Sequence, residues 1–162
     1  INKPFLILIF IFCFLGNKIH AEQSTAIEKY YYGPNLKPTN GLIKLQKLLD
    51  KNAFWAKNRT INDLKKCLAN SDVVISLWVG KEIVGFGRAL TDGIYRGVLW
   101  DIVIDQNHQG KGFGTLIVKN ILSSKKIKTT KKLYLMTTNK KLFYSQCDFK
   151  EVTSQNLLIR EI

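Results

Sequence analysis

Apolar and polar residues alternate along the middle of the chain, and this period of two predicts β-strands. Strands are expected at 73–79, 82–89, 99–104 and 131–137. Gly80-Lys81 has the composition of a two-residue hairpin turn, and Asp92-Gly93 predicts the next turn. The first strands are therefore antiparallel, whereas 131–137 follows a helical segment and runs parallel to 99–104 through a crossover.

A helical spacing of apolar residues appears on both sides of these strands. Leucines and isoleucines recur at that spacing in 41–50, and a second helix is expected at 58–68, where Thr60 is placed as an N-cap with Asp63 three residues on. Residues 22–40 predict one short strand and a loop. The last residues, 157–162, predict a closing strand.

The stretch from 99 to 118 joins a strand to a helix through a glycine loop. Apolar residues alternate up to residue 104, and glycines stand at Gly110, Gly112 and Gly114 before a helix that ends near residue 123. Glycine backbones adopt dihedral angles closed to other residues, and a helix start offers free amides and a partial positive charge. The loop therefore predicts an anion site, with phosphate as the expected guest, and an ordinary tight turn is the alternative for the loop taken by itself.

The spacing of these glycines distinguishes the loop from other phosphate loops. Neither GxxxxGK[ST] nor GxGxxG is present, and what remains is Q-x-x-G-x-G on Gln109, Gly112 and Gly114, directly after an apolar strand. This motif resembles motif A of the GCN5-related N-acetyltransferases (GNAT), which holds the pyrophosphate of acetyl-coenzyme A. The segment GFGRALTDGIYRGVLWDIVIDQNHQGKGFG resembles in particular the cyanobacterial and plastid branch of that family.

The resemblance covers roughly residues 40–162 and implies a fold and a set of binding residues. The fold is α/β (α+β), a single mixed, mostly antiparallel sheet of about six to seven strands flanked by about four helices, whose two parallel strands splay apart around the pantetheine arm. Acetyl-CoA is the implied co-substrate, and no metal is implied. The implied binding residues are Ile102, Val103, Ile104, Gln109, Gly110, Lys111, Gly112, Phe113, Gly114, Thr115 and Asn139.

Acetyl transfer to an amine needs a proton acceptor, an oxyanion donor and an acid for the leaving thiolate. Tyr144 resembles the general acid of the family. Strand alternation places Asp101 on the opposite face from Trp100 and Ile102, where its carboxylate is either the base or a structural partner of Arg88, and both roles stay open. His108 is an acceptor by type, but a solvated loop position is expected for it. Backbone N–H groups at Val103 or Ile104 would hold the oxyanion.

The final motif departs from the family pattern, whereas the segment around Trp55 resembles the plastid branch. The family's final Y-x-x-x-G-F appears here with Asp148 in place of glycine, and Asp can adopt the left-handed conformation that a helix end requires. Asn139 lies closer to Tyr144 than in the usual pattern, so this helix is expected to start late. Trp55 and Arg59 resemble residues of the plastid branch beside the acceptor site, and Trp55 is expected to be a core ring.

The composition limits the classes of molecule that the protein is expected to bind. The chain has 162 residues, 46% of them hydrophobic, and a net charge of +13, enough for one domain. No stripe of arginines with interleaved aromatics indicates nucleic-acid binding, so the charge is assigned to solvated lysines, and no nucleic acid is expected. Three widely spaced cysteines indicate neither a disulfide framework nor a zinc site.

The domain division and location follow from the same features. Residues 1–22 are taken as an apolar leader too short to span a bilayer, with a signal peptide or anchor as the alternative, and 23–162 as the acetyltransferase domain. No membrane partner is expected, and a homodimer is left open. The lysine-rich, asparagine-rich composition and the resemblance point to a plastid (chloroplast stroma) or a cyanobacterial cytoplasm.

The combined hypothesis is an N-acetyltransferase that moves an acetyl group from acetyl-CoA to a primary amine by direct attack. The acceptor is a small-molecule amine or a protein amine. One alternative is a non-catalytic acyl-CoA-binding or sensing module, because Asp148 and the shortened final helix depart from the family pattern. Another is a basic nucleic-acid-binding protein, suggested by the net charge of +13.

Overall fold

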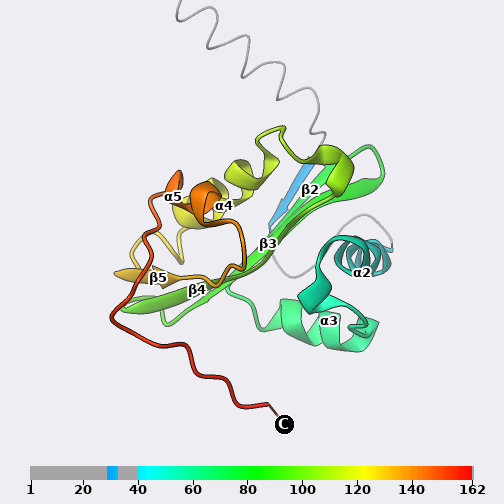
Figure 1. Ribbon diagram of the computed structural model, residues 1–162. Helices are drawn as coiled ribbons and strands as arrows, with labels where there is room; N and C mark the ends of the chain where they lie inside the picture. The colour runs from blue at the N-terminus through cyan, green and yellow to red at the C-terminus, as the bar shows by residue number, and fades with distance from the viewer. Residues whose placement is uncertain (1–28, 33–39, 162) are drawn as a thin grey trace, which may run out of the picture.

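A computed structural model describes residues 29–32 and 40–161, which form one sheet with helices on both faces (Figure 1). The strands stand in the order β1-β2-β3-β4-β5. Neighbours are antiparallel except β4 and β5, which are parallel. Their bounds are β1 Lys29–Tyr32, β2 Val73–Val79, β3 Glu82–Thr91, β4 Arg96–Ile104 and β5 Lys132–Tyr134.

The helices divide between the two faces of the sheet. Figure 1 shows α2 and α3 on one face and α4 and α5 on the other. Their bounds are α2 Gly41–Asn52, α3 Ile61–Ala69, α4 Phe113–Ser123 and α5 Lys141–Ser145, with short 3₁₀ turns η1 Phe54–Ala56 and η2 Gln106–His108. Among the described residues, no helix has the length and apolarity to cross a membrane.

Each face buries its own apolar cluster. One cluster joins α4 to the sheet, with Ile117 and Ile121 packed against strand residues such as Leu77 and Leu99. The other joins α2 and α3 to the sheet and includes Val103. Since burial of apolar surface is the main favourable term in folding, these two layers hold the strands between them.

Local signals in the sequence predicted several boundaries correctly. β2 ends at Val79 and β3 begins at Glu82, with Gly80 at φ 58 in the two-residue turn. The Thr60 hydroxyl accepts a hydrogen bond from the Asp63 amide at 3.1 Å, as expected for the N-cap of α3. α4 ends at Ser123, as its apolar spacing predicted.

Two strand predictions need correction. The strand expected at 131–137 is only Lys132–Tyr134, and 157–161 contain no strand, so the described sheet has five strands and not six to seven. Leu157, Leu158 and Ile159 are exposed, Leu158 at 88%. A strand requires a neighbour for its backbone hydrogen bonds, and none of the described strands pairs with this segment. The expected leader, 1–22, lies outside the described residues.

Candidate active site

The glycine loop forms an open start to α4. Gly110 and Gly112 have φ of 75 and 79, which glycine adopts without the strain that a side chain brings. Gly112 is the N-cap and supplies no side-chain hydrogen bond, and the first turn of α4 carries no acidic residue. The loop is tied to the end of β4 because the Gln109 side-chain amide donates to the Ile104 carbonyl oxygen at 3.3 Å.

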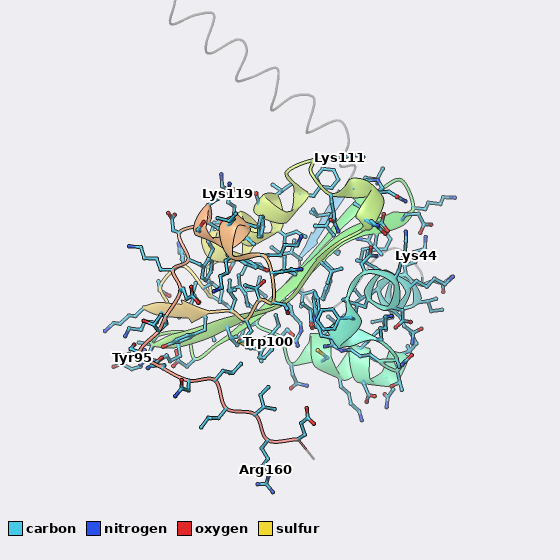
Figure 2. The ribbon with its side chains drawn as sticks, in the orientation of Figure 1. Lys44, Tyr95, Trp100, Lys111, Lys119 and Arg160 are labelled. Atoms are coloured by element: carbon cyan, nitrogen blue, oxygen red, sulfur yellow. The ribbon has the colours of Figure 1, made fainter. Side chains whose placement is uncertain are left out.

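The surroundings of this loop suit an anion. A Cβ placed on Gly110 would meet nothing within 4 Å, so the backbone is open to an approaching ligand. Lys111 and Lys119 are exposed on the loop and on α4 (Figure 2). The amides of the first turn, the positive end of the helix dipole and the exposed Lys111 suit a phosphate group at this helix start.

Gly114 and Phe113 have packing roles in addition. A Cβ on Gly114 would lie 3.1 Å from the Phe143 ring, so the glycine allows α5 to approach the start of α4. The Phe113 ring is buried and stacks on the His108 ring at 6.2 Å between centroids. The structure therefore brings the glycine loop next to the helix that carries Tyr144.

The parallel strands pair over a short length only. β4 and β5 are paired from Arg96 opposite Lys132 to Val98 opposite Tyr134, and the pairing stops there. The rest of β4, residues 99–104, has no described strand on that side. This segment includes Ile102, Val103 and Ile104, whose backbones the sequence proposed for contact with the pantetheine arm.

Asp101 lies at a bulge in β4. Arg88 of β3 pairs with Trp100, but Phe86 pairs with Val103, so β4 contains one extra residue there. Asp101 has φ 53, a left-handed conformation that Asp tolerates better than most residues. The expectation that Asp101 lies opposite Trp100 is wrong, because Arg88 contacts both the Asp101 carboxylate and the Trp100 ring. The expectation that it lies opposite Ile102 is correct, because Ile102 packs on the α4 side and Asp101 pairs with Arg59 on the other.

Two arginines hold the Asp101 carboxylate. Arg59 donates from Nη1 and Nη2 at 2.8 and 3.2 Å, and Arg88 donates from Nε at 2.7 Å. The Asp101 side chain is only 2% exposed. Burial acts to raise the pKa of Asp101, but the hydrogen bonds and charges of both arginines outweigh it and lower the pKa. A carboxylate held in this way is a weak proton acceptor.

Tyr144 is fixed by the end of α5. Asp148 has φ 65, as expected for the residue that replaces glycine. The Phe149 amide donates to the Tyr144 carbonyl oxygen at 3.1 Å and the Asp148 amide to the Ser145 carbonyl oxygen at 3.2 Å, the two bonds of a Schellman motif. α5 begins at Lys141, two residues after the exposed Asn139.

The environment of the Tyr144 ring keeps its phenol neutral. The ring meets Phe143 and Phe149 edge-on, with centroids 4.8 and 6.1 Å away. Burial, with a smaller effect of Cys147, raises the pKa of Tyr144 to about 12. Burial also raises the pKa of the Cys147 thiol. A thiolate in this region is therefore disfavoured as well.

His108 belongs to the turn before the glycine loop. Its Nδ1 lies 3.4 Å from Asp105 Oδ1, and Lys51 of α2 donates to Asp105 Oδ2 at 2.9 Å. Burial acts to raise the pKa of Asp105, but hydrogen bonds from Lys51, the Asn107 amide and His108 lower it to about 2. The expected solvated loop position is wrong in part, since His108 is half-buried against Phe113.

Aromatic residues on the α2 to α3 connection differ from expectation. Trp55 was expected in the core but is 52% exposed, and its ring meets the exposed Phe54 ring edge-on at 5.0 Å. The sequence did not identify Arg59 as a partner of Asp101. Its only signal was the likeness of the Trp55 and Arg59 pair to the plastid branch. Among the described residues, no cluster of metal-binding side chains is present.

Comparison with known proteins gives the class of this fold and site. Residues 70–151, which include the glycine loop and Tyr144, match the model of the acetyltransferase (GNAT) domain. A GNAT-family acetyltransferase from Streptococcus pneumoniae has a similar fold, with a TM-score of 0.65 and 20% identity over 82% of this chain and 98% of that one. The chain belongs to the GNAT acetyltransferase family.

Sequence relatives come from algae, cyanobacteria and plants. The chain is 34% identical over 85 residues, 50% of its length, to the uncharacterized N-acetyltransferase ycf52 of Pyropia yezoensis. It is 31% identical over 101 residues, 60% of its length, to a ycf52-like N-acetyltransferase of Prochlorococcus marinus. A chloroplastic GCN5-related N-acetyltransferase 2 of Arabidopsis thaliana is 28% identical over 52% of the chain and 33% of the relative. The chain spans about half the length of the ycf52 relatives, 48% and 55%.

Proposed function

We propose that this protein transfers an acetyl group from acetyl-CoA to a primary amine by direct attack. The observation that carries the proposal is the open start of α4, where Gly112 caps the helix without a side chain and Gly110 leaves the backbone accessible. The loop residues Gln109 to Thr115 would hold the pyrophosphate through backbone amides, helped by Lys111. The unpaired edge of β4 at Ile102, Val103 and Ile104 would receive the pantetheine arm.

The reaction forms a bond between the amine nitrogen and the acetyl carbon and breaks the bond from that carbon to sulfur. The backbone N–H of Ile104 would stabilise the oxyanion that develops on the carbonyl. The Asp105 N–H donates to the Val84 carbonyl oxygen of β3, and strand alternation directs the Val103 N–H to β3 as well. Asn139, an exposed residue that precedes α5, would also contact acetyl-CoA.

Tyr144 is proposed to donate a proton to the departing sulfur. Its phenol stays protonated throughout the physiological range because burial holds its pKa near 12. Burial also raises the pKa of the neighbouring Cys147 thiol. The same surroundings would destabilise the thiolate of the departing coenzyme A and so favour its protonation. The proton that leaves the attacking amine passes to water, because the Asp101 carboxylate is occupied by two arginines.

The place of action is proposed to be a plastid stroma, with a cyanobacterial cytoplasm as the alternative. The support is the likeness to the Prochlorococcus relative and to the chloroplastic Arabidopsis relative. The acceptor is a small-molecule or protein amine, and the proposal includes no nucleic acid and no membrane.

Two measurements on the full chain test this function. Isothermal titration calorimetry with acetyl-CoA should show one site, and a thiol-release assay with a panel of amines should show turnover. Binding without turnover on any amine would favour the second candidate, a non-catalytic acyl-CoA-binding module, for which the short α5 of Lys141–Ser145 is the supporting observation. Absence of binding would contradict both.

A further inference from the structure

A largely buried ion cluster at the bulge of β4 links the connection between α2 and α3 to strands β3 and β4. It consists of Arg59, Asp101 and Arg88, and we call it the Arg59–Asp101–Arg88 cluster. Arg59 precedes the N-cap of α3, and its carbonyl oxygen accepts a hydrogen bond from the Gln46 side chain of α2 at 2.7 Å. The cluster thus ties both helices of one face to β4 across 42 residues of sequence.

The bulge decides which face each later residue of β4 occupies. In a regular strand, Leu99 and Val103 would share a face, because side chains alternate. Here Leu99 packs in the α4 cluster and Val103 in the α2 and α3 cluster. Ile102 and Ile104 pack in turn on the α4 side. One extra residue therefore exchanges the faces of the segment that leads into the glycine loop.

The strand opposite the bulge accommodates this exchange. A Cβ placed on Gly87 of β3 would lie 2.7 Å from the Ile102 side chain and 2.5 Å from that of Ile117 in α4. A side chain at position 87 would therefore force Ile102 and Ile117 to shift. Sequence alternation without the bulge would instead bring the Asp101 carboxylate toward the apolar α4 face, where an unpaired charge is costly.

We propose that the Arg59–Asp101–Arg88 cluster is a positioning device: it holds β4 in its bulged register and so sets the geometry of the strand edge and loop that receive acetyl-CoA. The inference rests on the proposed function and gives Asp101 a role other than proton acceptor. Arg59 is a positioning residue too, since it acts through Asp101. Buried ion pairs are weak sources of stability, but they specify one arrangement among several, which is the task here.

The first test is a double-substitution cycle read by acetyl-CoA affinity on the full chain. Arg59→Gln and Asp101→Asn should each weaken binding by about tenfold, and the double variant by little more than either one, because both break the same device. Arg59→Lys should restore part of the affinity. The control is Glu82→Gln, which breaks the exposed ion pair of Lys44 with Glu82 at 3.1 Å and should leave affinity unchanged.

The second readout separates positioning from proton transfer. If Asp101 positions β4, the pH profile of thiol release by Asp101→Asn should keep the shape of the parent profile at lower affinity for acetyl-CoA. If Asp101 were the base, the defect should shrink at high pH, where the amine is already neutral. Independent, additive effects of the two substitutions, or a defect that disappears at high pH, would overturn the inference.

A third measurement does not depend on acetyl-CoA. Amide hydrogen exchange of Val103, followed by NMR in the free protein, should accelerate about tenfold in Arg59→Gln and stay constant in Glu82→Gln. If the parent protein binds no acetyl-CoA, the proposed function fails while this measurement still decides the inference. Unchanged exchange at Val103 in Arg59→Gln would contradict the positioning role.

Discussion

The starts of α3 and α4 are built in opposite ways. α3 begins with Thr60, whose hydroxyl accepts from the Asp63 amide at 3.1 Å, and with Asp63 in its first turn. α4 begins with Gly112, which offers no side-chain bond, and has no acid in its first turn. At the start of α3, side chains of the helix itself bond a free amide and place a negative charge at the positive end of the dipole. At the start of α4, the free amides and the positive end of the dipole are left for a ligand.

The difference teaches that the same local feature is structural in one place and open to a ligand in the other. Two helices of similar length, Ile61–Ala69 and Phe113–Ser123, both need partners for their first amides. The sequence supplies a hydroxyl to one and a glycine to the other. The end of α5 resembles the start of α3 in being satisfied within the chain, because the amides of Asp148 and Phe149 donate to its last carbonyl oxygens.

The largest effect is expected from Gly112→Glu at the open start. The side chain adds bulk and a negative charge where the pyrophosphate should lie, so acetyl-CoA affinity should fall on the order of 100-fold or more. Calorimetry measures it. Gly93→Glu is the matched control, since Gly93 also has a positive φ, 81, with open space around it, but lies in the turn between β3 and β4. Equal affinity in both variants would mean that the loop is an ordinary turn.

Tyr144→Phe tests whether the Tyr144 hydroxyl on α5 is the proton donor in the reaction. The substitution keeps the ring that packs against Phe143 and Phe149, so acetyl-CoA affinity should hardly change. Turnover should fall on the order of 100-fold, the size of a lost general acid. Single-turnover thiol release with a saturating amine is the appropriate assay. Parent-level turnover with an acceptor for which chemistry is rate-limiting would remove Tyr144 from the mechanism.

Thr60→Ala should weaken the closed start of α3 without affecting donor binding. Loss of an N-cap costs about 1 kcal/mol, which lowers the midpoint of thermal unfolding by roughly 2–4 °C in a domain of this size. Calorimetric unfolding and acetyl-CoA titration should be run on the same samples. A large loss of affinity at unchanged stability would show that the two helix starts are not independent.

Asp148→Gly should give the smallest effect, a stabilisation. Asp148 is exposed at φ 65, a conformation that costs a residue with a Cβ more than it costs glycine. The gain in unfolding free energy should be about 0.5 kcal/mol, measured by urea denaturation. Asp148→Ala serves as the comparison and should be less stable than the parent, since it keeps the Cβ and loses the polar group. A less stable Asp148→Gly would contradict this account of the α5 end.

Sequence alone determined the features whose causes lie within a few residues. The turn at Gly80, the cap at Thr60 and the glycine loop before α4 were predicted from neighbouring positions, and the left-handed Asp148 from its place in the family's final motif. Each depends on a backbone conformation that one residue type prefers, or on a hydrogen bond to an amide close in sequence. The loop motif and Tyr144 came from a family resemblance carried by equally local spacing.

Tertiary structure decided the features that depend on distant partners. Alternation put Asp101 and Trp100 on opposite faces, but a bulge shifts the register and brings both to Arg88. The second partner of Asp101, Arg59, is 42 residues away. Trp55 is exposed because the two helices bury leucines and alanines in their shared cluster instead. The expected strand at 131–137 pairs over three residues only, because its pairing with β4 stops at Val98 although β4 continues to Ile104. Which residue a strand meets across a sheet is set by the packing of the whole domain, and a local pattern does not contain it.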